Sequence, residues 1–124
     1  MNILGIGVDL VEVERISEAI GRHGPPFLRR IFTEREIAFC GVRHERLAAR
    51  FAAKEAVAKA FGTGIGAAMA FPDIEVVSED TGRPGIVLHG AAAATAAGRG
   101  VTGIHLSLSH TRSHAIAQVV IVGG

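Results

Sequence analysis

The sequence has one cysteine, no tryptophan and no tyrosine among its 124 residues, and its formal net charge is only +1. A single cysteine, Cys40, cannot form an intramolecular disulfide, so nothing indicates an oxidising compartment or a cysteine-based metal site. A net charge near zero provides no global field that would attract nucleic acid or a membrane surface. We therefore expect neither a disulfide-stabilised nor a nucleic-acid-binding protein.

Long apolar runs are also missing. The first apolar segment is interrupted by Asp9 and Glu12 and has no basic stretch before it, so it fits neither a signal peptide nor a transmembrane helix. The small-residue tract over 90–97 is too short to cross a bilayer. Because the chain is 48% hydrophobic and 20% charged, we expect it to fold, as one domain over residues 1–124. With no sign of a signal peptide, a membrane helix or a disulfide, we expect a cytoplasmic protein.

Hydrophobic periodicity and turn residues divide the chain into strands and helices. Alternating apolar residues predict strands, and the capping box formed by Thr33 and Glu36 predicts a helix start. The expected order is a strand over 3–13, helices over 13–22, 33–42 and 45–61, a hairpin over 74–77 and 86–89, a weak helix over 90–98, and strands over 103–109 and 115–122. Strands and helices in separate blocks favour an α+β fold, with helices packed on a largely antiparallel sheet.

Asp9 is unusual because it is a carboxylate within an otherwise apolar strand. An ionised carboxylate in such a place costs several kcal/mol unless it is paired or binds a metal. Asp9 shares its strand face with Gly5 and Gly7, and glycine in a strand often marks the close approach of another backbone or a ligand. The alternative is that Asp9 caps the following helix or pairs with Arg15.

The helix expected over 45–61 holds both lysines of the chain. Arg50 and Lys54 lie one turn apart, as do Glu55 and Lys59, so one helix face is basic with a single carboxylate in it. One interpretation is two ordinary surface pairs at i,i+4 spacing. The other is a cradle for a polyphosphate with one metal-binding carboxylate, which suits Mg²⁺ because this ion needs only one or two protein carboxylates beside substrate phosphates.

Other common sites are poorly supported. The spacing of His105, His110 and His114 is not typical of zinc ligands, and no Gly-x-Ser-x-Gly motif indicates a serine hydrolase. The glycine-rich segment over 62–66 follows a helix instead of preceding one, so by itself it is a helix stop and a flexible loop.

Three segments together resemble the holo-acyl-carrier-protein synthase family of 4′-phosphopantetheinyl transferases. They are the strand from Gly5 to Glu12, the helix and loop from Arg50 to Gly64 with its Lys-Glu-Ala-x-x-Lys element, and the final strands with His105 to His110 and Ala117 to Val120. The segments occur in the family's order and at the family's length. The resemblance implies transfer of phosphopantetheine from coenzyme A to a serine of an acyl carrier protein, with release of adenosine 3′,5′-bisphosphate, in support of fatty acid or polyketide synthesis.

The same resemblance implies roles for individual residues. Asp9 and Glu55 match the carboxylates that hold Mg²⁺ against the coenzyme A pyrophosphate, and Lys59 matches the motif lysine that contacts phosphate; these three are the expected catalytic residues. Glu55 would accept the serine proton directly or through a bound water, and both routes remain open. The residues expected to bind coenzyme A are Arg50, Lys54, Lys59, Gly62, Thr63, Gly64 and His105.

The resemblance also implies a homotrimer whose sites lie between subunits. The expected carrier-binding region surrounds the first helix and includes Arg15, Arg22, Phe27 and Leu28, because carrier proteins of this class are generally acidic; plain solubility is the alternative role for these arginines. A competing function is a non-catalytic module that binds coenzyme A or a nucleotide. The presence of Asp9, Glu55 and Lys59 together favours the enzyme.

Overall fold

The structure, a computed structural model, describes residues 1–124. Ten regular helices and strands and one 3₁₀ turn follow one another along the chain. In order they are β1 (Asn2–Glu12), α1 (Val13–His23), α2 (Pro25–Ile31), α3 (Glu34–Cys40), α4 (His44–Phe61), η1 (Phe71–Asp73), β2 (Ile74–Ser78), β3 (Pro84–Leu88), α5 (Gly90–Gly98), β4 (Val101–His110) and β5 (His114–Gly123).

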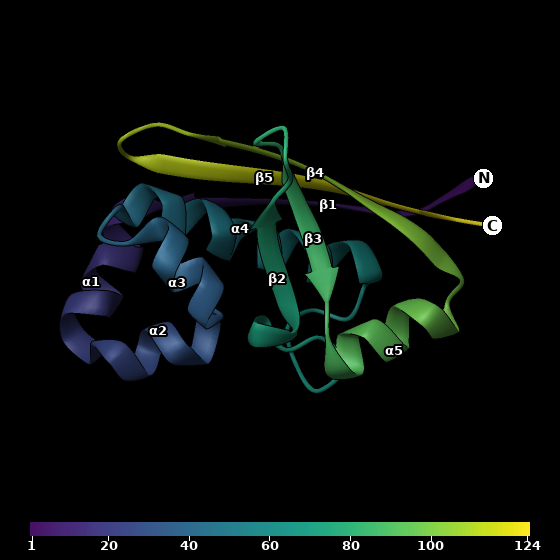
Figure 1. Ribbon diagram of the computed structural model, residues 1–124, viewed down its shortest axis with the longest axis horizontal. Helices are drawn as coiled ribbons and strands as arrows, with labels where there is room; N and C mark the ends of the chain where they lie inside the picture. Colours follow the sequence, from purple (N-terminus) through teal and green to yellow (C-terminus); the bar gives the residue numbers. More distant parts are fainter.

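The strands form two antiparallel sheets. The larger sheet has the order β1-β5-β4, which leaves β1 at one edge and β4 at the other, and the smaller sheet pairs β2 with β3. Figure 1 shows the large sheet almost edge-on along the top, with α1, α2 and α3 gathered at one end and the β2–β3 hairpin and α5 toward the other. The predicted α+β fold with antiparallel sheets is confirmed.

Helix α4 forms the centre of the core, beneath the large sheet. Small residues let it approach the sheet closely, and its buried positions are mostly alanine: Ala48, Ala49, Ala52, Ala53, Ala56, Ala58 and Ala60. One hydrophobic cluster joins the second half of α4 to β5, β2 and α5, and another joins its first half to α1, α2 and α3. No helix is both long and apolar enough to cross a membrane.

The other face of the large sheet carries no helix. All helices lie on one side of the sheet in Figure 1, and the opposite face presents apolar side chains to the surface. Ile6 is 66% exposed and Leu10 is 64% exposed, while Val8 and Ile116 extend the same apolar surface. A single copy of the chain therefore leaves an apolar strip uncovered along β1 and Ile116 of β5, whereas the exposed residues of the same face on β4 are polar.

Two elements were not predicted from the sequence. Pro25 and Pro26 end α1, as expected, but they also occupy the first positions of α2. Proline favours a helix start because its fixed φ suits the first turn and its missing N–H would be unpaired there anyway. The 3₁₀ turn η1 falls in a stretch to which the sequence analysis assigned no element. The Thr33–Glu36 capping box is present, and α3 ends at Cys40, two residues earlier than predicted.

Candidate active site

Gly5 and Gly7 let β1 lie directly against the second half of α4. A Cβ atom on Gly7 would overlap the carbonyl oxygen of Ala56, and one on Gly5 would overlap the carbonyl oxygen of Ala60. Both obstacles are backbone atoms, so no side-chain rotation could make room. The predicted close approach is therefore to a backbone, and it brings the inward face of β1, which continues with Asp9, onto α4.

Asp9 finds its partner on α4. Lys59 Nζ lies 3.0 Å from Asp9 Oδ1 and 3.1 Å from the carbonyl oxygen of Val8. The alternative partner, Arg15, is paired with Glu12 instead, at 3.3 Å, and α1 has no side-chain cap. The structure thus joins Asp9 to Lys59 and not to the first helix.

Glu55 completes a group of two carboxylates and one ammonium. Burial raises the pKa of Glu55 above its ordinary value, the negative charge of Asp9 raises it further, and the charge of Lys59 opposes the shift. Two carboxylates that share one cation carry excess negative charge, which favours either a bound proton or a bound metal ion. Asp9, Glu55 and Lys59 are called the carboxylate centre below.

The carboxylate centre fits Mg²⁺ better than a metal held only by protein. No group of three or more His, Cys, Asp or Glu side chains is placed to hold a metal ion. A hard cation with two carboxylate ligands takes its remaining oxygens from water and from substrate phosphates. The chemistry of Asp9 and Glu55 therefore suits a magnesium ion that arrives with a phosphate-bearing substrate.

Arg50 lies on a different side of α4, where it faces α3. Its side chain is only 6% exposed, its Nε is buried without a hydrogen-bond partner, and its guanidinium carbon stands 4.5 Å from the centre of the Phe39 ring. Arg46, one turn earlier, stacks over the same ring at 5.2 Å. Neither arginine is paired with a carboxylate, so both retain their charge for an anion.

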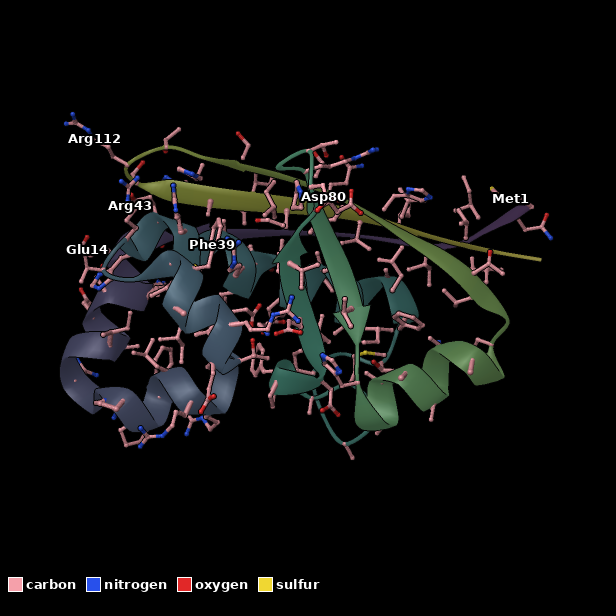
Figure 2. All side chains as sticks on the ribbon, viewed as in Figure 1. Met1, Glu14, Phe39, Arg43, Asp80 and Arg112 are labelled. Atoms are coloured by element: carbon pink, nitrogen blue, oxygen red, sulfur yellow. The ribbon has the colours of Figure 1, made fainter.

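The two arginines line an open cleft of about 260 Å³ together with Ser78, Gly82 and Pro84 of the β2–β3 turn. Figure 2 marks Phe39 on α3 and Asp80 on that turn. Sequence analysis did not single out Phe39 or Arg46. Only the i,i+4 spacing of Arg46 and Arg50 is visible in the sequence, and no local pattern indicates that α3 folds back to bring the Phe39 ring against both of them.

His105 lies at the β4 edge of the large sheet. It lines a second cleft, of about 270 Å³, with Glu79 and Arg83 of the β2–β3 turn, and Pro84 borders both clefts. Asp9 is on the opposite edge strand, with β5 between them. Since neighbouring strands are about 4.8 Å apart, roughly 10 Å of sheet separates the two edges. Within one chain, His105 and the carboxylate centre therefore form two separate groups.

The loop after α4 lies between η1 and the end of the helix. Gly62 ends α4 in the left-handed conformation, with φ 75°, which glycine adopts without strain. The N–H groups of Thr63 and Gly64 both donate to the carbonyl oxygen of Ala58, and all three loop residues are exposed. The loop follows Lys59 by about one helical turn.

Lys54 does not lie where a coenzyme A ligand is expected. Its side chain is 0% exposed, and its Nζ donates to the carbonyl oxygens of Phe71 and Ile74 and pairs with Glu36 Oε1 at 2.8 Å. All three donors of the ammonium are therefore used inside the protein. We correct the expectation that Lys54 binds coenzyme A: its position in the helix places it toward η1 and α3, not toward a cleft.

The expected carrier-binding region is partly exposed. Arg15 and Arg22 on α1 are exposed, Leu28 is half-buried, and Phe27 is buried in the core with Ile16. Phe27 therefore lies beneath the expected carrier-binding surface instead of on it, because α2 points this side chain into the core. The surface that remains available is basic and includes Arg29 and Arg30, also exposed, on α2.

Comparison with known proteins gives one consistent result. A family model described as the 4′-phosphopantetheinyl transferase superfamily matches residues 5–119. Proteins named holo-[acyl-carrier-protein] synthase are similar over nearly their whole length. The one from Koribacter versatilis is 50% identical over 122 residues, covering 96% of this chain and 98% of the relative, and the one from Vibrio parahaemolyticus is 45% identical, covering 98% of each.

Solved structures agree with the sequence relatives. The holo-[acyl-carrier-protein] synthase of Helicobacter pylori in complex with coenzyme A has a TM-score of 0.87 and 32% identity, over 94% of this chain and 99% of that one. The enzyme of Neisseria meningitidis has a TM-score of 0.91 and 35% identity, over 98% and 99% of the two chains. The resemblance drawn from the three sequence segments is confirmed, and the chain belongs to the 4′-phosphopantetheinyl transferase superfamily.

Proposed function

We propose that this protein is a holo-[acyl-carrier-protein] synthase, which transfers 4′-phosphopantetheine from coenzyme A to a serine hydroxyl of an apo acyl carrier protein. The carboxylate centre is the observation that carries the proposal, because it combines an ammonium for phosphate with a carboxylate of raised pKa. The names of the relatives and the coenzyme A complex of one of them support the same reaction. The holo carrier serves fatty acid or polyketide synthesis.

Each residue of the centre has a distinct task. The serine oxygen attacks the phosphorus that bears pantetheine, the bond from that phosphorus to the bridging oxygen breaks, and adenosine 3′,5′-bisphosphate leaves. Glu55 accepts the serine proton, directly or through a bound water. Lys59 neutralises phosphate charge, and its bond to Asp9 fixes the direction of its ammonium.

Asp9 and Glu55 are the residues that would hold Mg²⁺. When bound, this ion neutralises the pyrophosphate and aligns it with the attacking oxygen. Arg50, Lys59, His105 and the loop of Gly62, Thr63 and Gly64 bind coenzyme A. Arg50 suits a phosphate group because it is a buried, unpaired guanidinium at the wall of a cleft.

A direct experiment tests the reaction itself. The protein is incubated with coenzyme A, Mg²⁺ and an apo carrier protein, and the carrier is then weighed. We expect the carrier to gain the mass of one phosphopantetheine group, and we expect EDTA, Asp9→Ala or Glu55→Ala nearly to abolish the gain. Coenzyme A binding without any gain in carrier mass would favour the non-catalytic binding module.

We also propose that the protein is a homotrimer with sites shared between copies. Two observations support assembly: the uncovered apolar face of the large sheet, with Ile6 and Leu10, and the separation of His105 from the carboxylate centre at opposite sheet edges. Second and third copies that cover this face would bring the β4 edge of one copy near the β1 edge of another. Each site would then combine one copy's carboxylate centre with a neighbour's Arg50 and His105.

Mixing two inactive variants tests the shared site. Glu55→Ala removes a residue of the carboxylate centre, and Arg50→Ala removes a residue of the cleft on the other side of α4. Co-assembled trimers should regain part of the wild-type activity, because some interfaces then contain two intact halves. A fully active monomer in sedimentation contradicts the shared site, whereas failed complementation shows that Arg50 serves its own subunit.

The carrier protein approaches α1 and α2 in this proposal. Arg15 and Arg22 are exposed and basic, which suits the acidic surface of a carrier, and Leu28 adds a half-buried apolar contact. A cytoplasmic location agrees with the lone, buried Cys40 and with coenzyme A as substrate.

A further inference from the structure

A chain of buried polar groups lies on the side of α4 that faces away from β1. Lys54 Nζ pairs with Glu36 Oε1, the backbone N–H of Thr33 donates to the same oxygen at 2.9 Å, and the N–H of Val76 donates to Glu36 Oε2 at 2.9 Å. Thr33 Oγ1 donates to Glu75 Oε2 at 2.6 Å. Glu36 is 1% exposed and Glu75 is 3% exposed. We call Thr33, Glu36, Lys54 and Glu75 the buried network.

The buried network joins four elements through one ammonium group. Lys54 belongs to α4, Glu36 and Thr33 begin α3, and the two carbonyl acceptors of Lys54, on Phe71 and Ile74, lie at η1 and the start of β2. Glu75 continues to the surface, where His89 Nε2 lies 3.0 Å from its Oε1. Every charged atom therefore has a partner, although burial still lowers the pKa of Lys54.

Most of the buried α4 surface is alanine. Seven of its twelve buried side chains are alanine methyl groups, which interdigitate little with neighbours, and the larger ones besides Lys54 are Leu47, Arg50, Val57 and Phe61. Three hydrogen bonds from one ammonium to three acceptors are strongly directional. We therefore infer that Lys54 contributes a large part of what holds the rotation of α4, opposite the close contact of α4 with the glycines of β1.

We propose that Lys54 is a positioning residue: its buried ammonium fixes the rotation of α4 and thereby the direction in which Glu55 and Lys59 face Asp9. This proposal rests on the proposed function of the carboxylate centre. Glu55 lies about 100° and Lys59 about 140° around the helix from Lys54. A rotation of about 10° would move groups that lie some 5–6 Å from the helix axis by about 1 Å. Misplacement of this size typically costs on the order of 10²-fold in rate.

The test removes the charge pair without leaving a buried charge alone. Lys54→Met leaves the buried Glu36 carboxylate without its positively charged partner, so this variant should be strongly destabilised. The double variant Lys54→Met/Glu36→Gln removes both charges and keeps one oxygen, for the N–H of Thr33, but its NH2 group then faces the N–H of Val76, so it should recover only part of the stability that Lys54→Met loses. Arg35→Met is the matched control, because Arg35 reaches the same network from the exposed surface, 3.7 Å from Glu75 Oε1.

Three measurements on the double variant test the positioning role: the kcat of transfer, the Kd of coenzyme A, and an NMR measurement of the contact between Lys59 and β1. We expect kcat of the double variant to fall at least tenfold and its Kd for coenzyme A to stay within about threefold of wild type. The kcat of the control Arg35→Met should stay within about twofold of wild type. A wild-type kcat in the stable double variant overturns the proposal, and so does a large loss of coenzyme A affinity at unchanged kcat. If the wild-type protein itself transfers no phosphopantetheine, the proposed function fails. The third measurement, by NMR, then decides alone whether Lys54 positions α4.

That measurement is the NMR contact between the Lys59 side chain and β1, where Lys59 Nζ lies 3.1 Å from the carbonyl oxygen of Val8 and 3.0 Å from Asp9 Oδ1. A rotated α4 should weaken the cross-peaks that join the Lys59 side chain to Val8 and Asp9 in the double variant. Unchanged cross-peaks show that α4 has not moved and overturn the positioning role. If the double variant does not fold, Lys54→Arg answers the same question: we expect it to keep coenzyme A affinity, lose kcat and weaken the same cross-peaks, and wild-type values of both overturn the proposal.

Discussion

Replacing Gly7 by alanine adds one methyl group at the point where β1 touches α4. The new Cβ atom would overlap the carbonyl oxygen of Ala56 and stand 2.9 Å from the backbone nitrogen of Ala60. Non-bonded carbon and oxygen atoms normally stand roughly 3.3 Å apart or more, so β1 and α4 must separate by about 1 Å. Because the obstacle is helix backbone, no rotamer change can absorb this shift.

The loss of stability in Gly7→Ala depends on the interface between β1 and α4 that this contact closes. Overpacking a core usually costs about 1–3 kcal/mol, and here the whole interface between a strand and the central helix opens, so we expect roughly 3 kcal/mol of lost stability. Asp9 lies two residues along the same strand face. A shift of about 1 Å relative to Glu55 and Lys59 should lower kcat on the order of 10²-fold.

Urea unfolding at fixed protein concentration measures the first effect, and carrier transfer measures the second. Gly98→Ala is the matched control, since a Cβ on Gly98, the last residue of α5, meets nothing within 4 Å. The control should gain a few tenths of a kcal/mol from helix propensity and keep its activity. A Gly7→Ala protein with wild-type unfolding midpoint and wild-type kcat would refute the argument from close approach.

Three further predictions test other parts of the structure. Because the pKa of Glu55 is raised in the folded state, the folded protein binds this proton more tightly than the unfolded chain, and stability falls as pH rises through the raised pKa. Glu55→Gln should remove this fall and be roughly 0.5 kcal/mol more stable than wild type near neutral pH in EDTA; pH-dependent melts identical to wild type would count against it. Reversing Arg15 and Arg22 to Glu should raise the carrier KM about tenfold with coenzyme A affinity unchanged, and salt-independent wild-type kinetics would oppose this prediction. Ile6→Asp on the uncovered sheet face should sediment as a smaller species and lose transfer activity, and wild-type sedimentation would contradict the proposed assembly.

Local patterns in the sequence were sufficient for most elements of the fold. Alternating apolar residues locate β1, the Thr33–Glu36 capping box locates the start of α3, and the left-handed Gly62 locates the end of α4. The α2 helix was missed because Pro25 and Pro26 stop one helix and start the next, and only the first role is apparent from their position after α1.

Long-range contacts account for what the sequence did not indicate. Helical spacing placed Arg50 and Lys54 on one face, yet Arg50 reaches an open cleft while Lys54 is enclosed by η1 and α3. Spacing within one helix cannot distinguish these environments, since they depend on which later segments pack there. Glu36 likewise looked like a capping residue alone, because its second partner, Lys54, is far away in sequence.

Glu55 is proposed to accept the serine proton in the transfer step, in addition to holding Mg²⁺, and one paired measurement on Glu55→Gln tests this role most directly. Coenzyme A affinity is measured by titration in EDTA, where the loss of a magnesium ligand does not affect it, and transfer is measured with Mg²⁺ by the mass of the carrier protein, on the same preparation. We expect the affinity to stay within a few-fold of wild type and the transfer rate to fall by about 10²–10⁴, the usual contribution of a positioned acid or base. Transfer at the wild-type rate by Glu55→Gln would contradict the carboxylate centre as the site of the reaction.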